Sequence, residues 1–229
     1  MKKIGLILLI IGFVVAGATS VSAATIGLYD LEFNIDGILS NPISGDPVPA
    51  GVDDSGFNYT NGLGMLTIAL SGGGSHFVGL FVDHEIDEAT NTYFNENGAA
   101  IGTAAGQSWE IDEPGYLGGD IYTNFSNSAL DNSNNVPAGS EDDVSMALGW
   151  DFILDTDKTA VIDFMISTTA PGGFYLNQKD PDSLVDIYFS STLDLEGDVP
   201  PIPEPATLLL LGTGLVGLCA SQRKKLFKK

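Results

Sequence analysis

Apolar and polar residues alternate with a period of two in three parts of the chain. The longest run is residues 144–155, in which apolar side chains occupy every second position from Val144 to Leu154, with Trp150 among them. Residues 185–195 and 29–35 follow the same pattern. A period of two over this length indicates strands with one face buried. The pattern predicts an all-β domain, with Trp150 in its core and Tyr29 on the buried face of its strand.

Shorter apolar runs predict further strands at residues 65–70, 77–82, 159–167 and 173–177. Residues 155–158 (Asp-Thr-Asp-Lys) form a polar break typical of a hairpin turn. Residues 124–140 are polar and without periodicity, so we expect a long surface loop there. Seven or more short strands separated by Gly, Asn and Asp turns predict an antiparallel β-sandwich, of jelly-roll or immunoglobulin-like type.

An apolar segment precedes this domain. Lys2 and Lys3 come before the apolar run at residues 4–18, and Val21-Ser22-Ala23 offers the small residues that a signal peptidase requires. We therefore expect residues 1–23 to be a signal peptide cleaved after Ala23, with Ala24 as the next choice. An uncleaved anchor is the alternative, and either arrangement exports the domain at residues 24–199.

A second apolar segment follows the domain. Residues 200–205 are rich in proline, which lacks an amide donor and fixes φ, so this linker should be extended. Residues 206–222 are mostly apolar, and we expect them to form a transmembrane helix. The tail at residues 223–229 is basic, which by the positive-inside rule places it in the cytoplasm. Its basic residues are Arg223, Lys224, Lys225, Lys228 and Lys229.

The order of these three parts carries a resemblance. Pro203-Glu204-Pro205, the apolar helix and the basic tail resemble the PEP-CTERM sorting signal of Gram-negative bacteria. The resemblance implies recognition by an exosortase, a membrane-embedded enzyme similar to cysteine transpeptidases. It further implies removal of the tail near the motif and release or attachment of the protein at the cell surface, often together with exopolysaccharide and biofilm formation.

The middle of the chain resembles a domain found in exported proteins of this class. The stretches that carry the resemblance are FVDHEIDEATNTYFNENGAA, GQSWEIDEPGY and EDDVSMALGWDF. It implies a shared all-β domain and supplies no activity.

Charge is distributed unevenly along the chain. Residues 24–199 contain 29 acidic residues but only Lys158 and Lys179 as basic ones, a net charge of −27. Such a domain repels nucleic acid and anionic lipid head groups, so we expect contact with the inner membrane only through the sorting helix. Cys219, the single cysteine, lies in the second apolar segment. The domain therefore depends on burial rather than on a disulfide.

The histidines give little support for catalysis. His76 and His84 are eight residues apart, which on one strand corresponds to roughly 26 Å. They could not then share a metal or a substrate atom, and we expect His84 to be a surface residue in an acidic loop. No nucleophile is placed beside either histidine, so we expect a protein that is not an enzyme. A glycan hydrolase that uses a pair of acids stays open as an alternative.

Clustered acids suggest a calcium site as a further alternative. Hard oxygen ligands of this kind suit Ca²⁺, although the first group lacks the glycine and the final glutamate of an EF-hand loop. The competing interpretation is a solvated acidic surface without any cofactor. The candidate ligands are Asp83, Glu85, Asp87, Glu141, Asp142 and Asp143.

Four aromatic residues in an acidic, glycine-rich stretch invite two interpretations. They could stack on sugar rings, or they could close the core of a small sandwich, and we favour the core because large aromatics contribute mainly buried area. They are Trp109, Tyr116, Tyr122 and Phe125.

Three functions follow from these patterns. The leading hypothesis is an exported cell-surface or matrix protein that is processed by signal peptidase and exosortase and interacts with extracellular polysaccharide. The second is a secreted carbohydrate-binding module, with or without a dependence on calcium. The third is the hydrolase.

Overall fold

The computed structural model describes residues 24–89, 92–115, 118–183 and 185–196. The expected signal peptide, the Pro203-Glu204-Pro205 motif, the transmembrane helix and the basic tail lie outside these residues. No helix within the described ranges has the length and apolar character needed to cross a membrane.

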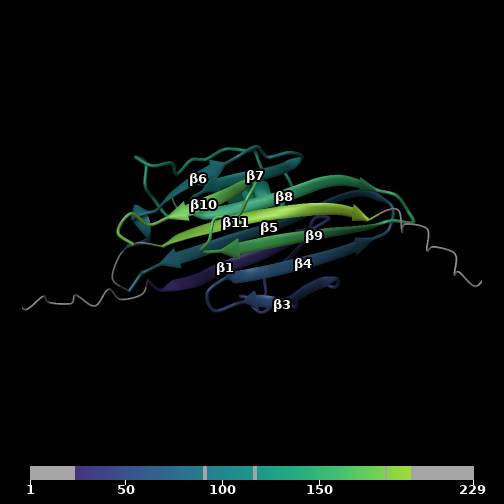
Figure 1. The fold of residues 1–229 in the computed structure, drawn as a ribbon, viewed down its shortest axis with the longest axis horizontal. Coiled ribbons are helices and arrows are strands. Elements are labelled where there is room, and N and C mark those ends of the chain that lie inside the picture. The colour runs from purple at the N-terminus through teal and green to yellow at the C-terminus, as the bar shows by residue number, and fades with distance from the viewer. Residues whose placement is uncertain (1–23, 90–91, 116–117, 184, 197–229) are drawn as a thin grey trace, which may run out of the picture.

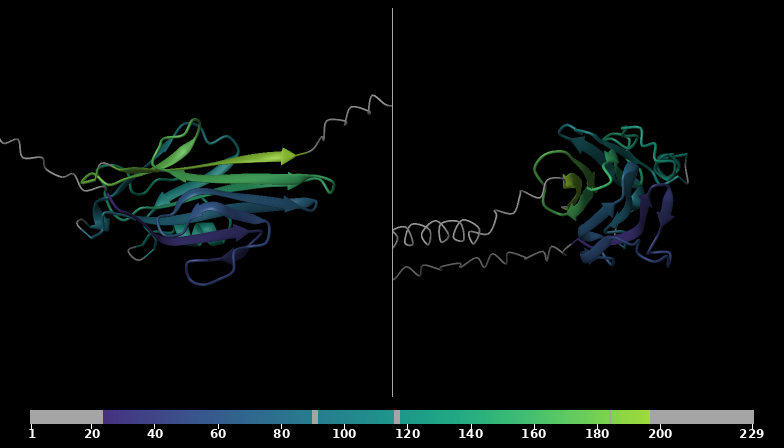
Figure 2. Two further views of the ribbon diagram at one scale, coloured as in Figure 1. Left: turned by 60° about the horizontal axis from the view of Figure 1, so that its bottom comes forward. Right: turned by 90° about the vertical axis from the view of Figure 1, so that its right-hand side faces the viewer.

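Two antiparallel sheets form a sandwich (Figures 1 and 2). One sheet has five strands in the order β2-β1-β5-β8-β7, and the other has six in the order β3-β4-β9-β11-β10-β6. The predicted all-β sandwich is therefore confirmed. The elements are β1 (Ile26–Ile35), β2 (Ile38–Ser40), β3 (Val52–Asn58), β4 (Leu63–Ser71), β5 (Gly74–Ile86), η1 (Tyr93–Asn95), β6 (Asn97–Ile101), β7 (Gln107–Asp112), α1 (Ile121–Ser126), β8 (Ser145–Leu154), β9 (Thr159–Ser167), β10 (Tyr175–Lys179) and β11 (Asp186–Glu196).

The core lies between the sheets and follows the predicted alternation. Met146 and Leu148 of β8 and Phe189 of β11 are fully buried in it. Trp150 of β8 packs against this core but is only half-buried, so the prediction that it is a core residue is corrected. Its indole N–H instead donates to Oγ of Ser191 at 2.9 Å, which joins the two sheets through a polar contact.

The predicted inward position of Tyr29 is wrong, because β1 contains a bulge. The pairing of β1 with β5 shifts register between Leu28 and Asp30, so Tyr29 is the extra residue. A bulge reverses the side to which the following residues point. Leu28 packs against the core in place of Tyr29, whose side chain is 67 % exposed, whereas Leu31 stays buried.

The expected loop at residues 124–140 begins as a helix. Helix α1 covers the outer face of the five-stranded sheet, meaning the face that points away from the six-stranded sheet. There Phe125 packs against Phe81 of β5, with ring centroids 5.9 Å apart. Nδ2 of Asn34 donates to the Phe125 carbonyl at 2.7 Å and fixes the helix in place. A second, smaller core therefore lies outside the sandwich, where sequence periodicity gave no sign of one.

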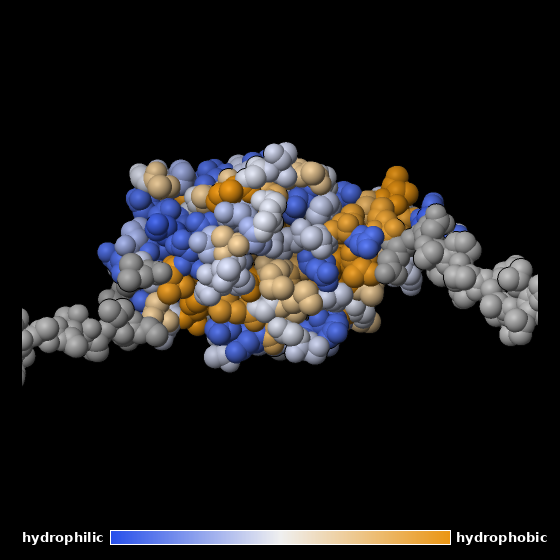
Figure 3. Space-filling view, viewed as in Figure 1, coloured by the Kyte–Doolittle hydropathy of each residue, from blue (hydrophilic) through white to orange (hydrophobic). Residues whose placement is uncertain are grey.

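The two ends of the sandwich differ. Strand β5 begins at Gly74, which pairs with Leu154, and near its end Glu85 pairs with Gly27. Strand β11 ends with Glu196 paired to Thr159, at the Leu154 end. The final residues of β5 and of β11 therefore lie at opposite ends of the long axis (Figure 1). Hydrophilic side chains gather at the end where β5 finishes and β11 begins (Figure 3).

Candidate functional site

A row of polar side chains crosses the outer face of the five-stranded sheet. Asp30 of β1 pairs with Asp83 of β5, Asp83 pairs with Ser145 of β8, and Ser145 pairs with Asp112 of β7. Residues directly opposite one another in antiparallel strands have Cβ atoms about 4.5–5.5 Å apart, and like charges in such positions destabilise a sheet. Three carboxylates in one row, buried or close to burial, therefore require an explanation.

Asp83 lies at the centre of a buried group of carboxylates. Its side chain is 2 % exposed, and Asp143, just before β8, is 3 % exposed. Burial raises the pKa of Asp83 well above its usual range, and the charges of Asp143 and Glu85 raise it further. Burial, followed by the charges of Asp143 and Glu88, raises the pKa of Glu85 to about 7.

Glu96 supplies a fourth carboxylate behind this group. It is fully buried, and an isolated bridge to Asp142 holds its backbone. Its Oε1 accepts from the Ile86 amide at 3.3 Å, and its Oε2 accepts from Nε2 of Gln178. Burial raises the pKa of Glu96 to about 9, whereas the Gln178 hydrogen bond acts in the opposite direction. Glu96 is thus fixed in position, with its oxygens engaged.

A pocket of ≈ 250 Å³ opens onto Glu85 and Asp143 of this group. Two tyrosines, Tyr29 and Tyr93, lie in its wall beside the carboxylates, and the bulge in β1 accounts for the exposure of Tyr29. Carboxylate oxygens and aromatic rings that converge on one cavity can bind a cation, a sugar or both. The lining residues are Tyr29, Glu85, Glu88, Tyr93, Pro114 and Asp143.

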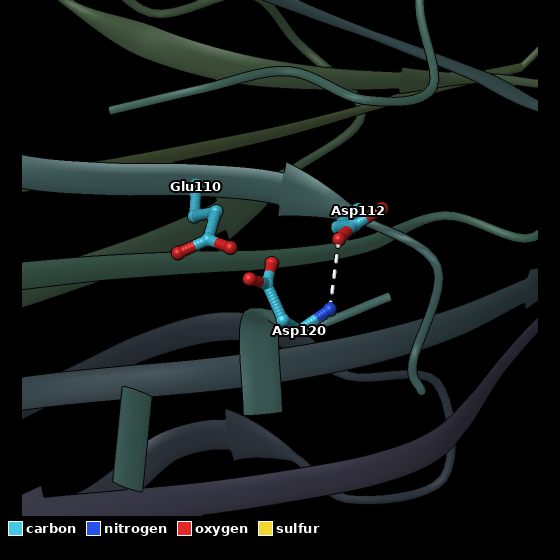
Figure 4. A group of neighbouring side chains, drawn as sticks. All are labelled: Glu110, Asp112 and Asp120. Carbon is cyan, nitrogen blue, oxygen red and sulfur yellow. Dashed lines mark hydrogen bonds between the residues drawn. The ribbon is translucent and has the colours of Figure 1, made fainter. Parts of the chain in front are cut away.

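A second acidic group lies nearby on the same face. One carboxylate oxygen from each of Glu110, Asp112 and Asp120 lies within 4.8 Å of the others. Figure 4 shows the carboxylates of Glu110 and Asp120 turned toward each other between β7 and the start of α1. Burial is the main cause that raises the pKa of Glu110 to about 7.

Hydrogen bonds from the α1 region explain much of this second group. Glu110 accepts from Nδ2 of Asn124 at 3.0 Å, and Asp112 accepts from the Asp120 amide at 3.0 Å. Nδ2 of Asn135 donates to the same oxygen of Asp112 at 3.2 Å. The group therefore acts as an anchor that holds residues 120–135 against the sheet.

Three of the six candidate calcium ligands lie in the same part of the structure, but among the described acids only Glu110, Asp112 and Asp120 have oxygens within 4.8 Å of one another. Asp83, Glu85 and Asp143 belong to the buried group, although the calcium interpretation itself stays a prediction. Asp87 instead accepts hydrogen bonds from the backbone and hydroxyl of Thr25.

The two remaining candidates have other contacts. Glu141 is exposed and accepts from the Gly139 amide at 2.7 Å. Oδ1 of Asp142 accepts a hydrogen bond from the Asp143 amide at 2.9 Å. The two acids therefore shape the turn that leads into β8.

His84 is not the surface residue that was expected. It lies on β5 between two acids, but alternation turns it to the opposite face, where it is fully buried. Its Nε2 lies 3.2 Å from the Gly62 carbonyl oxygen, and burial lowers the pKa of His84 to about 4. His76 instead hydrogen-bonds Asp36 at 2.8 Å near the other end of β5. The expected separation of the histidines along one strand is confirmed.

Several site residues were not singled out from the sequence. Glu96 follows a short 3₁₀ helix and has no strand pattern around it. Glu110 and Asp112 flank Ile111 in an apolar–polar alternation that could have indicated strand β7 and an acidic outer face. Of the four aromatic candidates, Phe125 is confirmed as a core residue, whereas Tyr116 lies outside the described residues.

The comparisons with known proteins bear on the segment beyond β11. Residues 201–224 match the family model of the PEP-CTERM protein-sorting motif. No curated protein and no solved structure matches the chain. The part of the chain that the structure describes is therefore an all-β domain, and a C-terminal sorting signal follows it. That signal is PEP-CTERM, which marks the chain as an exported exosortase substrate of Gram-negative bacteria with a membrane-anchored precursor.

Proposed function

We propose that the mature protein is a non-catalytic component of the cell surface or extracellular matrix that associates with exopolysaccharide. The observation that carries this proposal is the sorting motif at residues 201–224, joined to a folded and strongly acidic β-sandwich. A domain with a net charge of −27 is well suited to a hydrated, ion-rich matrix, since it stays soluble and repels nucleic acid and anionic lipid.

The geometry of the sandwich supports display of the acidic pocket. Strand β11 ends at Glu196, shortly before the sorting motif, and Glu196 lies at the end of the sandwich opposite to Glu85. A precursor held through the segment after β11 would therefore present the pocket away from the membrane. The same orientation would suit a mature protein attached through that segment.

The environments of the histidines support a non-catalytic role. His84 is buried against Gly62 in the core, and His76 is paired with Asp36. In these positions each ring has a structural partner, and neither lies on the pocket wall. Histidine is the commonest general base, so its use in packing favours binding over catalysis.

Fractionation of cells that lack the exosortase tests this proposal. The full-length chain should accumulate in the membrane fraction, and Pro203→Ala with Glu204→Ala should have the same effect in the parent strain. Glu196→Ala, which removes an acid just upstream of the motif, should leave sorting unchanged. Normal release of the protein without the exosortase would contradict the proposal.

The pocket favours glycan binding as a second candidate function. Tyr29 is exposed beside Glu85 and Asp143, so it can stack on a sugar ring while the acids accept hydrogen bonds from hydroxyl groups. A glycan array probed with the wild-type chain and with Tyr29→Ala, each with and without chelator, tests this function. Equal glycan signals for the two proteins would argue against it.

A further inference from the structure

The pocket beside Tyr29 has walls that are held by hydrogen bonds within the chain. Just after β5, the Asp87 carboxylate accepts hydrogen bonds from the amide and the hydroxyl of Thr25, and the Asp87 amide donates to the Thr25 carbonyl at 2.8 Å. Asp87 lies between the wall residues Glu85 and Glu88 in the sequence. These contacts therefore fix the backbone that carries both acids relative to the start of β1.

Two further wall residues, Asp143 and Pro114, are fixed in a similar way. Asp143 follows Asp142, whose backbone exchanges two hydrogen bonds with that of Glu96, at 3.0 and 3.1 Å. Glu113 accepts hydrogen bonds from two backbone amides on the C-terminal side of Pro114. Separate segments of the chain are thus tied together around the cavity, and small-molecule sites are usually pre-formed in this way.

The size of the pocket limits the ligand to a small group. Its volume is ≈ 250 Å³, below the roughly 300–1,000 Å³ of pockets that enclose drug-sized ligands. Tyr29, Tyr93 and Pro114 provide flat apolar surfaces in its wall, on which a ring can pack. The space therefore suits one sugar ring rather than several.

The charge of the walls favours a cationic ligand. Three carboxylates line the pocket, those of Glu85, Glu88 and Asp143, and none of the lining residues is basic. Residues 24–157, which provide every wall, contain neither Lys nor Arg. The buried Oε2 of Glu85 has no hydrogen-bond partner among the residues that the structure describes, and such an atom is costly unless a ligand or water satisfies it.

A bare metal ion does not fit this arrangement. Among the described acids, only Glu110, Asp112 and Asp120 bring three carboxylate oxygens within 4.8 Å of one another, and these acids are not part of the pocket lining. Carboxylates that are set around a wider cavity instead suit a larger organic cation, whose hydrogen-bond donors are spread over several atoms.

We propose that the pocket binds a protonated amino sugar, and hence that the polysaccharide recognised by this protein carries free amino groups. The ammonium group donates charge-assisted hydrogen bonds to Glu85 and Asp143, while Tyr29 stacks on the sugar ring and attracts the positive charge. This inference rests on the proposed association with exopolysaccharide and names the chemical class of the polysaccharide.

The exposed tyrosine favours a sugar over the lysine side chain of a protein partner. Tyr29 is 67 % exposed, so one face of its ring is open beside the acids. A sugar ring presents apolar C–H groups to such a face and hydroxyl donors around its rim, which Glu88 can accept. A lysine side chain carries all of its donors on one terminal nitrogen and leaves the remaining acceptors of the pocket unsatisfied.

Calorimetric titration of the full chain in a non-ionic detergent tests the proposal. The probe is a hexamer of β-1,4-linked glucosamine, and the same hexamer with every amino group acetylated is the uncharged control. The NaCl concentration is about 0.15 M, because the domain attracts any cation and salt screens that attraction beyond about 8 Å. We expect the charged hexamer to bind at least about tenfold more tightly, since acetylation removes the charge-assisted hydrogen bonds.

Three variants locate the binding site. Tyr29→Ala and Glu85→Gln should each weaken binding of the charged hexamer at least about tenfold. Glu141→Gln removes the same charge from an exposed position outside the pocket lining, so it is the matched control and should bind like the wild type. Because the Tyr29 side chain is largely exposed, Tyr29→Ala should keep the Tm of the wild type, which shows that its loss of binding is not a loss of fold.

Three results would overturn the proposal. Equal binding of the two hexamers, lost in Tyr29→Ala, would leave a glycan site but remove the requirement for an amino group. Equal weakening in Glu85→Gln and Glu141→Gln would reduce the binding to general charge attraction. A lysine hexapeptide that binds as tightly as the glucosamine hexamer, with the same dependence on Tyr29, would make the partner a basic peptide. None of these results bears on exosortase processing, which the fractionation of cells tests separately.

Discussion

The small outer core predicts that Phe125→Ala destabilises the whole domain, although the residue lies in a stretch that looks like a polar loop. Phe125 is fully buried between α1 and the outer face of the five-stranded sheet. Its ring contacts Phe81, and it packs so close to Gly79 that a Cβ at that position would lie 3.0 Å from the ring. The substitution would remove the contact of this ring with Phe81 and Gly79 of β5.

The expected cost follows from the packing. Replacement of a buried Phe by Ala typically costs about 3–5 kcal/mol. This core consists of five buried residues under a helix of six residues, so partial collapse should place the value near the lower limit, about 3 kcal/mol. For a domain of this size, about 1 kcal/mol shifts Tm by about 2–4 °C, so Tm should fall by about 6–12 °C.

Thermal unfolding of the full chain, followed by near-ultraviolet circular dichroism, measures this effect. Thr123→Ala is the matched control, because Thr123 is exposed on the same helix and should change stability by less than about 0.5 kcal/mol. Equal Tm values for Phe125→Ala and the wild type would refute the existence of the outer core. A large loss in Thr123→Ala would show that the helix, rather than the buried ring, determines stability.

Two further predictions concern stability. Burial raises the pKa of Glu110 from 4.5 to about 7. The contribution of Glu110 to the stability of the folded domain is therefore fully present below pH 4.5 and is lost as the pH rises through about 7. After allowance for screening by water, we expect the free energy of unfolding to fall by about 1–2 kcal/mol between about pH 5 and pH 8. Glu110→Gln should abolish this fall, and Glu141→Gln should retain it. The same dependence of Tm on pH in the wild type and in Glu110→Gln would contradict the prediction. The Ser191 hydroxyl accepts a hydrogen bond from Trp150 and donates one to Gln107, each at 2.9 Å. Ser191→Ala should therefore lower the free energy of unfolding, measured in urea, by about 2 kcal/mol. A change below about 0.5 kcal/mol would show that the contact between the sheets contributes little to stability.

The strands were predictable where one face is consistently apolar. Residues 144–155 and 185–195 became β8 and β11 because alternation over ten residues is hard to satisfy in any other structure. The same rule failed at Tyr29, since a bulge inserts one residue without leaving a mark in the apolar pattern. It also missed β7, although Ile111 of that strand lies in the main core, and it missed α1, whose apolar residues Ile121 and Phe125 face the outer core.

The candidate site was predictable only in part, because it depends on contacts between distant strands. The sequence could place Asp83 and Glu85 on the same face of the sheet, since they lie two residues apart on one strand. Their proximity to Asp143 follows from the pairing of β5 with β8, and that of Glu96 follows from its bridge to Asp142. A sequence without such pairing information shows many acids, and only the sheet register shows which of them are buried together.

The central claim is that the sandwich is exported and then separated from its sorting tail. Intact-mass measurement of the protein recovered from the cell surface or medium tests this claim. We predict a main species that begins near Ala24, contains the whole of β11 to Glu196, and lacks residues 223–229. A main species that still carries Lys229 would contradict the claim.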